Sequence, residues 1–239
     1  MELATGRQLD EGLWAFERPL STFGFQIGTR MTVVRLADGS LFLHSPVTLD
    51  AATRADLDAL GPVRFVVAPN RVHHFYVAAY REAYPEAELW AAPGLAEKKA
   101  SIPFDHVLGD APADGWSAEL DQALVAGIPH LNEVVFLHRR TRTLLLTDLA
   151  MNFVEGQTRL TRLWLRLMGV HRGFATSRLV RSLVRDRSAL HASFQRVLAW
   201  DFERVSVTHG VVLQRSGKRV LRGAWEFAQP AAPECHSRS

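Results

Sequence analysis

The stretch VRFVVAPNRVHHF, residues 63–75, decides how this chain is built. Val63 to Ala68 form an apolar run that is typical of a buried strand, and a polar turn with two adjacent histidines follows it. The residues from Tyr76 to Tyr84 are then typical of a helix. Many α/β proteins carry their chemistry in such a turn, because the loops at the carboxyl ends of strands form a crevice. We therefore expect His73 and His74 at a functional site.

The composition is that of a globular protein with a substantial core. The 239 residues are 47% hydrophobic and 22% charged. No apolar run reaches the roughly 18 residues of a membrane span, and the first residues lack the basic and apolar segments of a signal peptide. The single cysteine, Cys235, excludes an internal disulfide framework and a thiolate metal cluster. A cytoplasmic location is the default expectation.

Apolar runs and turn signals predict a domain that combines strands and helices. Asp38-Gly39 separates two apolar runs and indicates a hairpin. Further strands are expected at 87–91, 120–125, 133–137, 143–147 and 202–208, with helices at 48–60, within 157–200 and at 211–228. This order predicts one α/β/α layered domain with mixed sheets over 1–228, followed by a disordered tail at 229–239.

Three later polar residues also stand at the ends of apolar runs: His130, Asp148 and His209. Together with the histidine turn, their order resembles the metallo-β-lactamase fold superfamily. In that superfamily a strand leads into an H-x-H-x-D-H motif, then come a Gly-His, a strand that ends in a bridging Asp, and a final Ser-His-Gly. The corresponding stretches here are 69–74, 127–130, 145–148 and 207–210. The resemblance implies an αββα sandwich with two mixed β-sheets and a helical insertion at 155–200.

The histidine motif departs from the superfamily pattern in ways that bear on function. Pro69, Arg71 and His73 replace its first histidine, its second histidine and its aspartate, and only His74 is retained. Arginine cannot be deprotonated in proteins, so Arg71 opposes a cation at the first metal position. The resemblance leaves four expected metal ligands: His74, His130, Asp148 and His209. It also implies that His73 and Asp148 are catalytic residues.

Such a ligand set suits one zinc or iron ion with an open position for water. The resemblance then implies a mononuclear metal-dependent hydrolase of a small ester, thioester or lactone-like compound. The sequence is also similar to one branch of the superfamily, a domain of unknown function that is found in bacteria and phototrophs. The sequence equally allows a metal-free pocket that binds a small anionic ligand through Arg71 and Asn70. Glu133 is expected on a solvated strand edge.

Other motifs for common chemistries are missing from the sequence. No Gly-rich phosphate loop occurs, and the absence of G-x-S-x-G disfavours a serine hydrolase.

The segment 157–200 is strongly basic. It holds nine arginines and one acid, Asp186, so it carries a net charge of +8 in a chain whose total is +3. The arginines recur every three or four residues and therefore share helical faces. Such faces could contact an anionic surface, whereas nucleic-acid binding is not expected.

Overall fold

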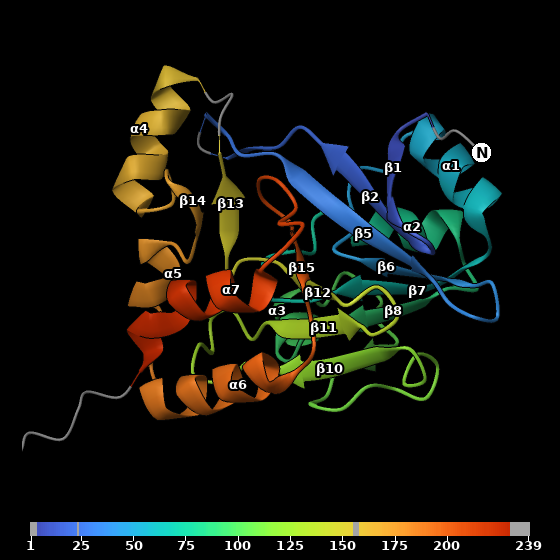
Figure 1. Ribbon diagram of the computed structural model, residues 1–239. Coiled ribbons are helices and arrows are strands. Elements are labelled where there is room, and N and C mark those ends of the chain that lie inside the picture. Colours follow the sequence, from blue (N-terminus) through green and yellow to red (C-terminus); the bar gives the residue numbers. More distant parts are fainter. Residues whose placement is uncertain (1–3, 23, 155–157, 230–239) are drawn as a thin grey trace, which may run out of the picture.

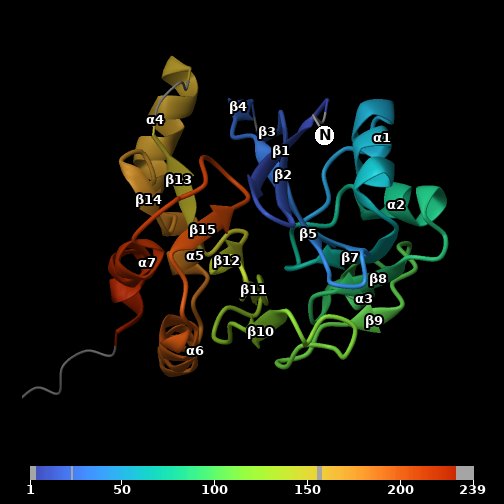
Figure 2. The ribbon, with the colours of Figure 1, turned by 45° about the vertical axis from the view of Figure 1, so that its right-hand side comes forward.

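The protein is a sandwich of two β-sheets with helices on both outer faces (Figures 1 and 2). The computed structural model describes residues 4–22, 24–154 and 158–229. Both sheets contain parallel and antiparallel pairs, so the predicted αββα sandwich with two mixed sheets is confirmed. Within the described ranges, no helix is long and apolar enough to cross a membrane.

The first sheet has seven strands. In spatial order they are β1 (Gly6–Asp10), β2 (Leu13–Arg18), β5 (Thr29–Arg35), β6 (Leu41–His44), β7 (Val63–Ala68), β8 (Glu88–Ala91) and β9 (His106–Val107). β1 to β6 pair antiparallel, and β6 to β9 pair parallel. The predicted hairpin joins β5 and β6, with Gly39 in the left-handed region at φ 83°.

Helices α1 (Ala51–Leu60) and α2 (Val77–Ala83) provide the parallel connections on either side of β7. Asp50 caps α1, because its side chain accepts a hydrogen bond from the Thr53 N–H. Both helices pack on the outer face of the sheet through buried side chains such as Leu57 and Tyr80. The short helix α3 (Leu95–Lys98) follows β8.

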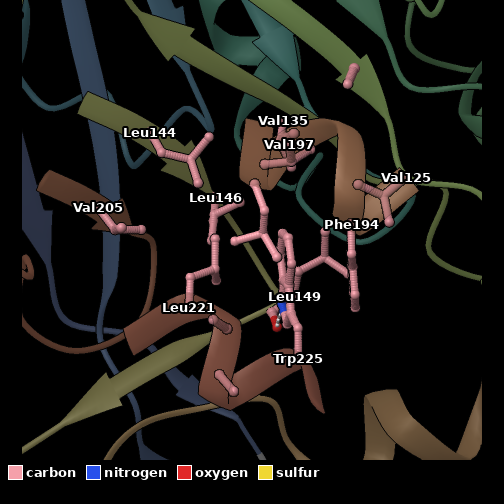
Figure 3. Close-up of a cluster of buried hydrophobic side chains, with 14 of the residues drawn as sticks. Val125, Val135, Leu144, Leu146, Leu149, Phe194, Val197, Val205, Leu221 and Trp225 are labelled. Atoms are coloured by element: carbon pink, nitrogen blue, oxygen red, sulfur yellow. Dashed lines mark hydrogen bonds between the residues drawn. The ribbon is translucent and has the colours of Figure 1, made fainter. Parts of the chain in front are cut away.

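The second sheet has four strands: β10 (Leu120–Leu124), β11 (Val134–His138), β12 (Thr143–Leu146) and β15 (Arg204–Val207). Helices α6 (Arg187–Ala199) and α7 (Gly217–Trp225) and the 3-10 helix Glu226–Ala228 cover its outer face (Figure 3). Phe194 of α6 stacks on Trp225 of α7, with ring centroids 3.6 Å apart. The helix expected at 211–228 begins only at Gly217, because Leu213 pairs with Val205 as a β-bridge.

An aromatic core fills the space between the two sheets. Phe42 and Phe65 of the first sheet meet Phe136 of the second, and Trp116 lies among them. The ring centroids of Phe42 and Phe136 are 5.2 Å apart. This packing fixes the two sheets relative to each other, and so it also fixes the loops at the ends of their strands.

A further layer lies at one end of the sandwich (Figure 1). It contains the hairpin β3 (Ser21–Thr22) and β4 (Phe25–Gln26), the pair β13 (Met151–Phe153) and β14 (Gly173–Ala175), and the helices α4 (Arg159–Met168) and α5 (Arg178–Ser182). Of the expected helical insertion at 155–200, residues 155–157 lie outside the described part of the chain. Residues 230–239 of the expected tail lie outside it too. Helix α6 packs on the second sheet rather than in this end layer.

Candidate metal centre

Two histidines and one aspartate meet where strands of the two sheets end. His73 lies in the turn after β7, Asp148 follows β12, and His209 follows β15. His73 Nε2 is 3.3 Å from Asp148 Oδ2, and His209 Nε2 is 3.6 Å from Asp148 Oδ1. The three donor atoms all lie within 4.8 Å of one another. His73, Asp148 and His209 together form the candidate metal triad, or triad for short.

The second nitrogen of each histidine is held by another part of the chain. His73 Nδ1 is 2.9 Å from Ser45 Oγ, and His209 Nδ1 is 2.7 Å from the carbonyl oxygen of Gly28. A hydrogen bond from the far ring nitrogen to a carbonyl or hydroxyl orients most metal-binding histidines. Ser45 directly follows β6 and adopts a left-handed backbone conformation, with φ 58°. Such strained positions are frequent at functional sites.

The Gly28 carbonyl fixes the protonation of His209. A carbonyl can only accept a hydrogen bond, so the proton of a neutral ring lies on Nδ1. Burial, reinforced by the nearby His73, lowers the pKa of His209 to about 4, and the ring is therefore neutral at neutral pH. Its bare Nε2 then faces the Asp148 carboxylate, and two electron-rich atoms oppose each other. A cation between them removes this conflict.

Asp148 is held by an internal polar network. Asn70, which has no exposed surface, donates from Nδ2 to Asp148 Oδ2 over 2.8 Å. Burial alone would raise the pKa of Asp148, but the charge of His73 and the hydrogen bonds from His73 and the Asn70 amide hold that pKa well below its usual range. The carboxylate is therefore ionised and can serve as a ligand.

A second buried carboxylate, Glu133, closes the network from behind. It is 1% exposed and accepts hydrogen bonds from the backbone N–H groups of Thr147, Asp148 and Leu149. Burial and the neighbouring Asp148 raise the pKa of Glu133. These backbone N–H groups all donate to the Glu133 carboxyl, an arrangement that suits its ionised form. The expectation of a solvated strand edge for Glu133 is therefore wrong.

The charge of His73 depends on the two buried carboxylates. Burial alone would lower the pKa of His73, but the Asp148 carboxylate and the more distant Glu133 raise it. If Glu133 is ionised as well as Asp148, two carboxylates face at most one positive charge, on His73. Buried charges need compensation, and a divalent cation with neutral histidines would supply it.

The donor set and its spacing fit such a cation. Zinc binds histidine nitrogen and carboxylate oxygen at about 2.0–2.2 Å, which places tetrahedral ligands roughly 3.3 Å apart. The separations of His73 and His209 from the two different oxygens of Asp148, 3.3 and 3.6 Å, are near that value, and one donor atom from each residue lies within 4.8 Å of the others. Two imidazoles and one carboxylate are ligands that both zinc and iron accept.

The structure does not bring all the predicted metal ligands together. His74 is 6% exposed and is not part of the group, and burial together with Lys99 and Lys98 lowers its pKa to about 4. His130 is exposed and is not part of the group. The ligand positions expected for His74 and His130 therefore find no support in the geometry, whereas those of Asp148 and His209 agree with it. His73, expected as a catalytic residue, lies among the ligands.

Arg71 and Asn70, the expected substrate-binding pair, both have other partners. Arg71 Nη1 donates to the carbonyl of Pro129 over 2.8 Å, away from Asp148. The side-chain amide of Asn70 forms internal hydrogen bonds, and its Oδ1 accepts the N–H groups of Val72 and His73. Neither placement supports contact with a substrate.

Sequence reasoning missed two residues that shape the site, Ser45 and Gly28. A third is His44, which is 1% exposed and whose Nε2 has no partner among the described residues. Burial, followed by the charge of His73, lowers the pKa of His44 to about 3. The only sequence signal for His44 and Ser45 was their place at the end of the apolar run 41–43, and Gly28 gave none.

A family model described as a domain of unknown function, DUF4336, matches residues 10–168. The chain belongs to the DUF4336 family. The match confirms the expected relation to a branch without a known function. It covers His73 and Asp148 but ends before His209. A comparison with curated proteins finds no match for this DUF4336 chain.

Solved structures show the same fold. The metallo-β-lactamase from Erythrobacter litoralis with β-mercaptoethanol in its active site has a TM-score of 0.67 and 15% identity, over 95% of this chain and 98% of that one. FIM-1 from Pseudomonas aeruginosa, in its mono-zinc form, has a TM-score of 0.62 and 15% identity, over 96% and 98%. The metal-soaked Flv1 flavodiiron core from Synechocystis has a TM-score of 0.62 and 14% identity, over 94% and 60%. At these identities the likeness shows the metallo-β-lactamase fold.

Proposed function

We propose that this DUF4336 protein binds one zinc or iron ion through His73, Asp148 and His209 and is a mononuclear metal-dependent hydrolase. The single observation that carries the proposal is the orientation of His209. Its Nδ1–H is committed to the Gly28 carbonyl, so its bare Nε2 faces the Asp148 carboxylate at 3.6 Å. The buried negative charge of Asp148 supports the same conclusion.

An ion in the triad would supply Lewis acidity and a water nucleophile at neutral pH. The protein's own residues set the geometry. Ser45 and Gly28 orient the two imidazoles, while Asn70 and the Glu133-bound loop orient Asp148. Burial lowers the pKa of His73 but the Asp148 carboxylate raises it, and any proton on Nε2 must leave before that nitrogen can act as a ligand.

The low exposure of the triad favours a small substrate. The side chains of His73, Asp148 and His209 are only 10%, 12% and 5% exposed. A small ester, thioester or lactone-like compound could present one carbonyl to such a site. Acyl compounds of this size are the substrates to be screened first.

A second candidate is a metal-free pocket that no longer performs chemistry. One observation favours it: protonated His73 lies 3.3 Å from Asp148 and could neutralise it as an ion pair. The version of this hypothesis that binds an anionic ligand through Arg71 has no support, because Arg71 donates to Pro129. The ion pair leaves the bare Nε2 of His209 facing Asp148, so the metal site is the better account.

Elemental analysis of protein purified without chelator tests the proposal. We expect about one zinc or iron per chain in the wild type. His209→Ala should lose the metal. His74→Ala and His130→Ala should keep it, because those side chains lie outside the triad. These two variants are matched controls, since each also removes one imidazole.

Thermal unfolding provides an independent readout. Free zinc at about 100 times its dissociation constant should stabilise the folded state by about 2.7 kcal/mol, which corresponds to a rise in Tm of roughly 5–10 °C. His209→Ala should show no such rise. Metal far below one equivalent in the wild type, with no thermal shift on adding zinc, would leave the metal-free pocket as the correct account. Bound metal without activity toward any ester, thioester or lactone would refute the hydrolase alone.

A further inference from the structure

Helix α4 presents apolar side chains to solvent. Leu160, Leu163 and Leu167 are 58%, 54% and 58% exposed, and their spacing of three and four residues places them on one stripe. The helical spacing of these leucines would normally predict a face that packs against the core. A surface that leaves several large apolar side chains together in water usually contacts something else.

The helix cannot turn to bury this stripe, because its opposite face is fixed. Thr161 and Leu165 are buried against the end layer. Trp164 stacks on Phe25 of β4, with ring centroids 5.2 Å apart. Thr161 Oγ1 also accepts the Gln26 N–H over 3.2 Å. The exposed leucines are therefore a permanent feature of the folded surface.

Three arginines flank the stripe. Arg159, Arg162 and Arg166 share the neighbouring face of α4 and, with Leu163, line a shallow hollow of about 200 Å³. None of the three forms an ion pair with a carboxylate in the described part of the chain. Together these six residues form the leucine–arginine surface of α4, which stands at the outer end of the molecule (Figures 1 and 2).

We propose that the leucine–arginine surface docks on an anionic lipid bilayer. A helix of this kind lies in the membrane interface, with its leucines among the acyl chains and its cations at the headgroups. Charge complementarity selects the anionic lipid, because the six residues of the surface include three cations and no carboxylate. A second copy of this chain fits less well, since pairing two such helices would bring like charges together. A nucleic acid would not account for the leucines.

The docking is independent of the metal triad, so it can be tested whatever the outcome of the metal analysis. The assay is cosedimentation of the full chain with vesicles of phosphatidylcholine alone or with about one third phosphatidylserine. We expect binding only to the anionic vesicles, and weaker binding as the salt rises from about 0.05 to about 0.2 M.

Two triple variants separate the contributions of charge and apolar contact. Arg159→Gln, Arg162→Gln and Arg166→Gln together should weaken binding about 100-fold, at about fivefold per cation. Leu160→Gln, Leu163→Gln and Leu167→Gln together should weaken it by roughly tenfold per leucine. All six side chains are exposed, and glutamine is a good helix former, so the fold should remain.

Helix α7 and the turn before it provide the matched control. Arg215, Arg219 and Arg222 are exposed, and α7 carries no exposed large hydrophobic side chain. Changing these three to glutamine removes the same charge but should weaken binding less than about fivefold. Equal losses in the control and in the α4 arginine variant would overturn the proposal, as would equal binding to both vesicle types.

Two further outcomes would also overturn it by pointing to another partner. Loss of vesicle binding with the arginine variant but none with the leucine variant would mean attraction by charge alone, without the leucines entering the bilayer, and would leave an acidic macromolecule as the better partner. A dimer in sedimentation velocity that the leucine variant converts to a monomer would indicate a second copy of the chain.

Discussion

Asn70 joins the loops of the site, and its removal should have a large effect on stability. Its Nδ2 donates to Thr147 Oγ1 and Asp148 Oδ2, both over 2.8 Å, and to Glu133 Oε2 over 3.2 Å. Its Oδ1 accepts the Val72 and His73 N–H groups. Asn70→Ala removes all of these contacts from a position with no exposed surface.

The cost can be worked out from those contacts. A buried N–H without an acceptor costs about 1–3 kcal/mol, and a lost hydrogen bond to a carboxylate costs about 1.5–3 kcal/mol. The Val72 N–H is close to solvent and adds little, so the His73 N–H and Asp148 decide the total. We expect Asn70→Ala to lower the free energy of unfolding by about 4 kcal/mol, and Tm by roughly 8–16 °C.

The assay is urea or thermal unfolding in the presence of a chelator, so that loss of metal does not contribute. Asn152→Ala is the matched control: Asn152 is 4% exposed, but its side chain makes one hydrogen bond, to the Val211 carbonyl. That variant should lose about 1 kcal/mol. An Asn70→Ala variant no less stable than Asn152→Ala would refute the view that Asn70 holds the loops together.

Three further predictions concern the surroundings of the triad. The pKa of His44 falls from 6.5 to about 3 on folding, so its contribution to stability is complete above pH 6.5 and is lost as the pH falls. In metal-free wild-type protein, His44 should lower the free energy of unfolding by roughly 1.4 kcal/mol per pH unit below 6.5, and His44→Phe should abolish this contribution. The same pH dependence of urea unfolding in the wild type and the variant would contradict this. Ser45→Ala should weaken zinc binding about 10–100-fold in a competition titration yet keep some hydrolysis, whereas complete loss of activity with metal retained would indicate a serine nucleophile. Gly210→Ala places a Cβ 2.1 Å from the Asn152 carbonyl oxygen at a residue with φ 91°, and should destabilise the fold by roughly 3 kcal/mol or more. Gly24→Ala is its control: Gly24 has φ 82° but open space around it, so the variant should lose only about 1 kcal/mol in the same unfolding assay.

The fold was predictable because its signals are local and repeated. The apolar run at 63–68 and the Asp38-Gly39 hairpin each specify one element, and both appear in the structure. The sequence also singled out Asp148 and His209, which the structure brings together with His73, because each stands two residues after a short apolar strand. The order of these strands was enough to indicate the superfamily.

The details of the site were not predictable for physical reasons. His73 and His74 are adjacent in a turn, and whether one or the other faces Asp148 depends on backbone angles that the sequence does not reveal. Glu133 finds its partners 14 to 16 residues away, in the backbone of another loop. Gly28 acts through a carbonyl, which every residue type possesses. The exposure of Leu160 and its two companions depends on which face of α4 meets the end layer.

The placement of the triad also bears on how the folded chain comes apart. His73 extends from the seven-stranded sheet, whereas Asp148 and His209 extend from the four-stranded sheet. An ion bound to all three would act as a clasp between the two halves of the sandwich, in a chain whose single cysteine allows no internal disulfide. Separation of the halves would then require release of the ion, so metal-loaded protein should unfold slowly and resist proteases for longer than its stability alone would suggest.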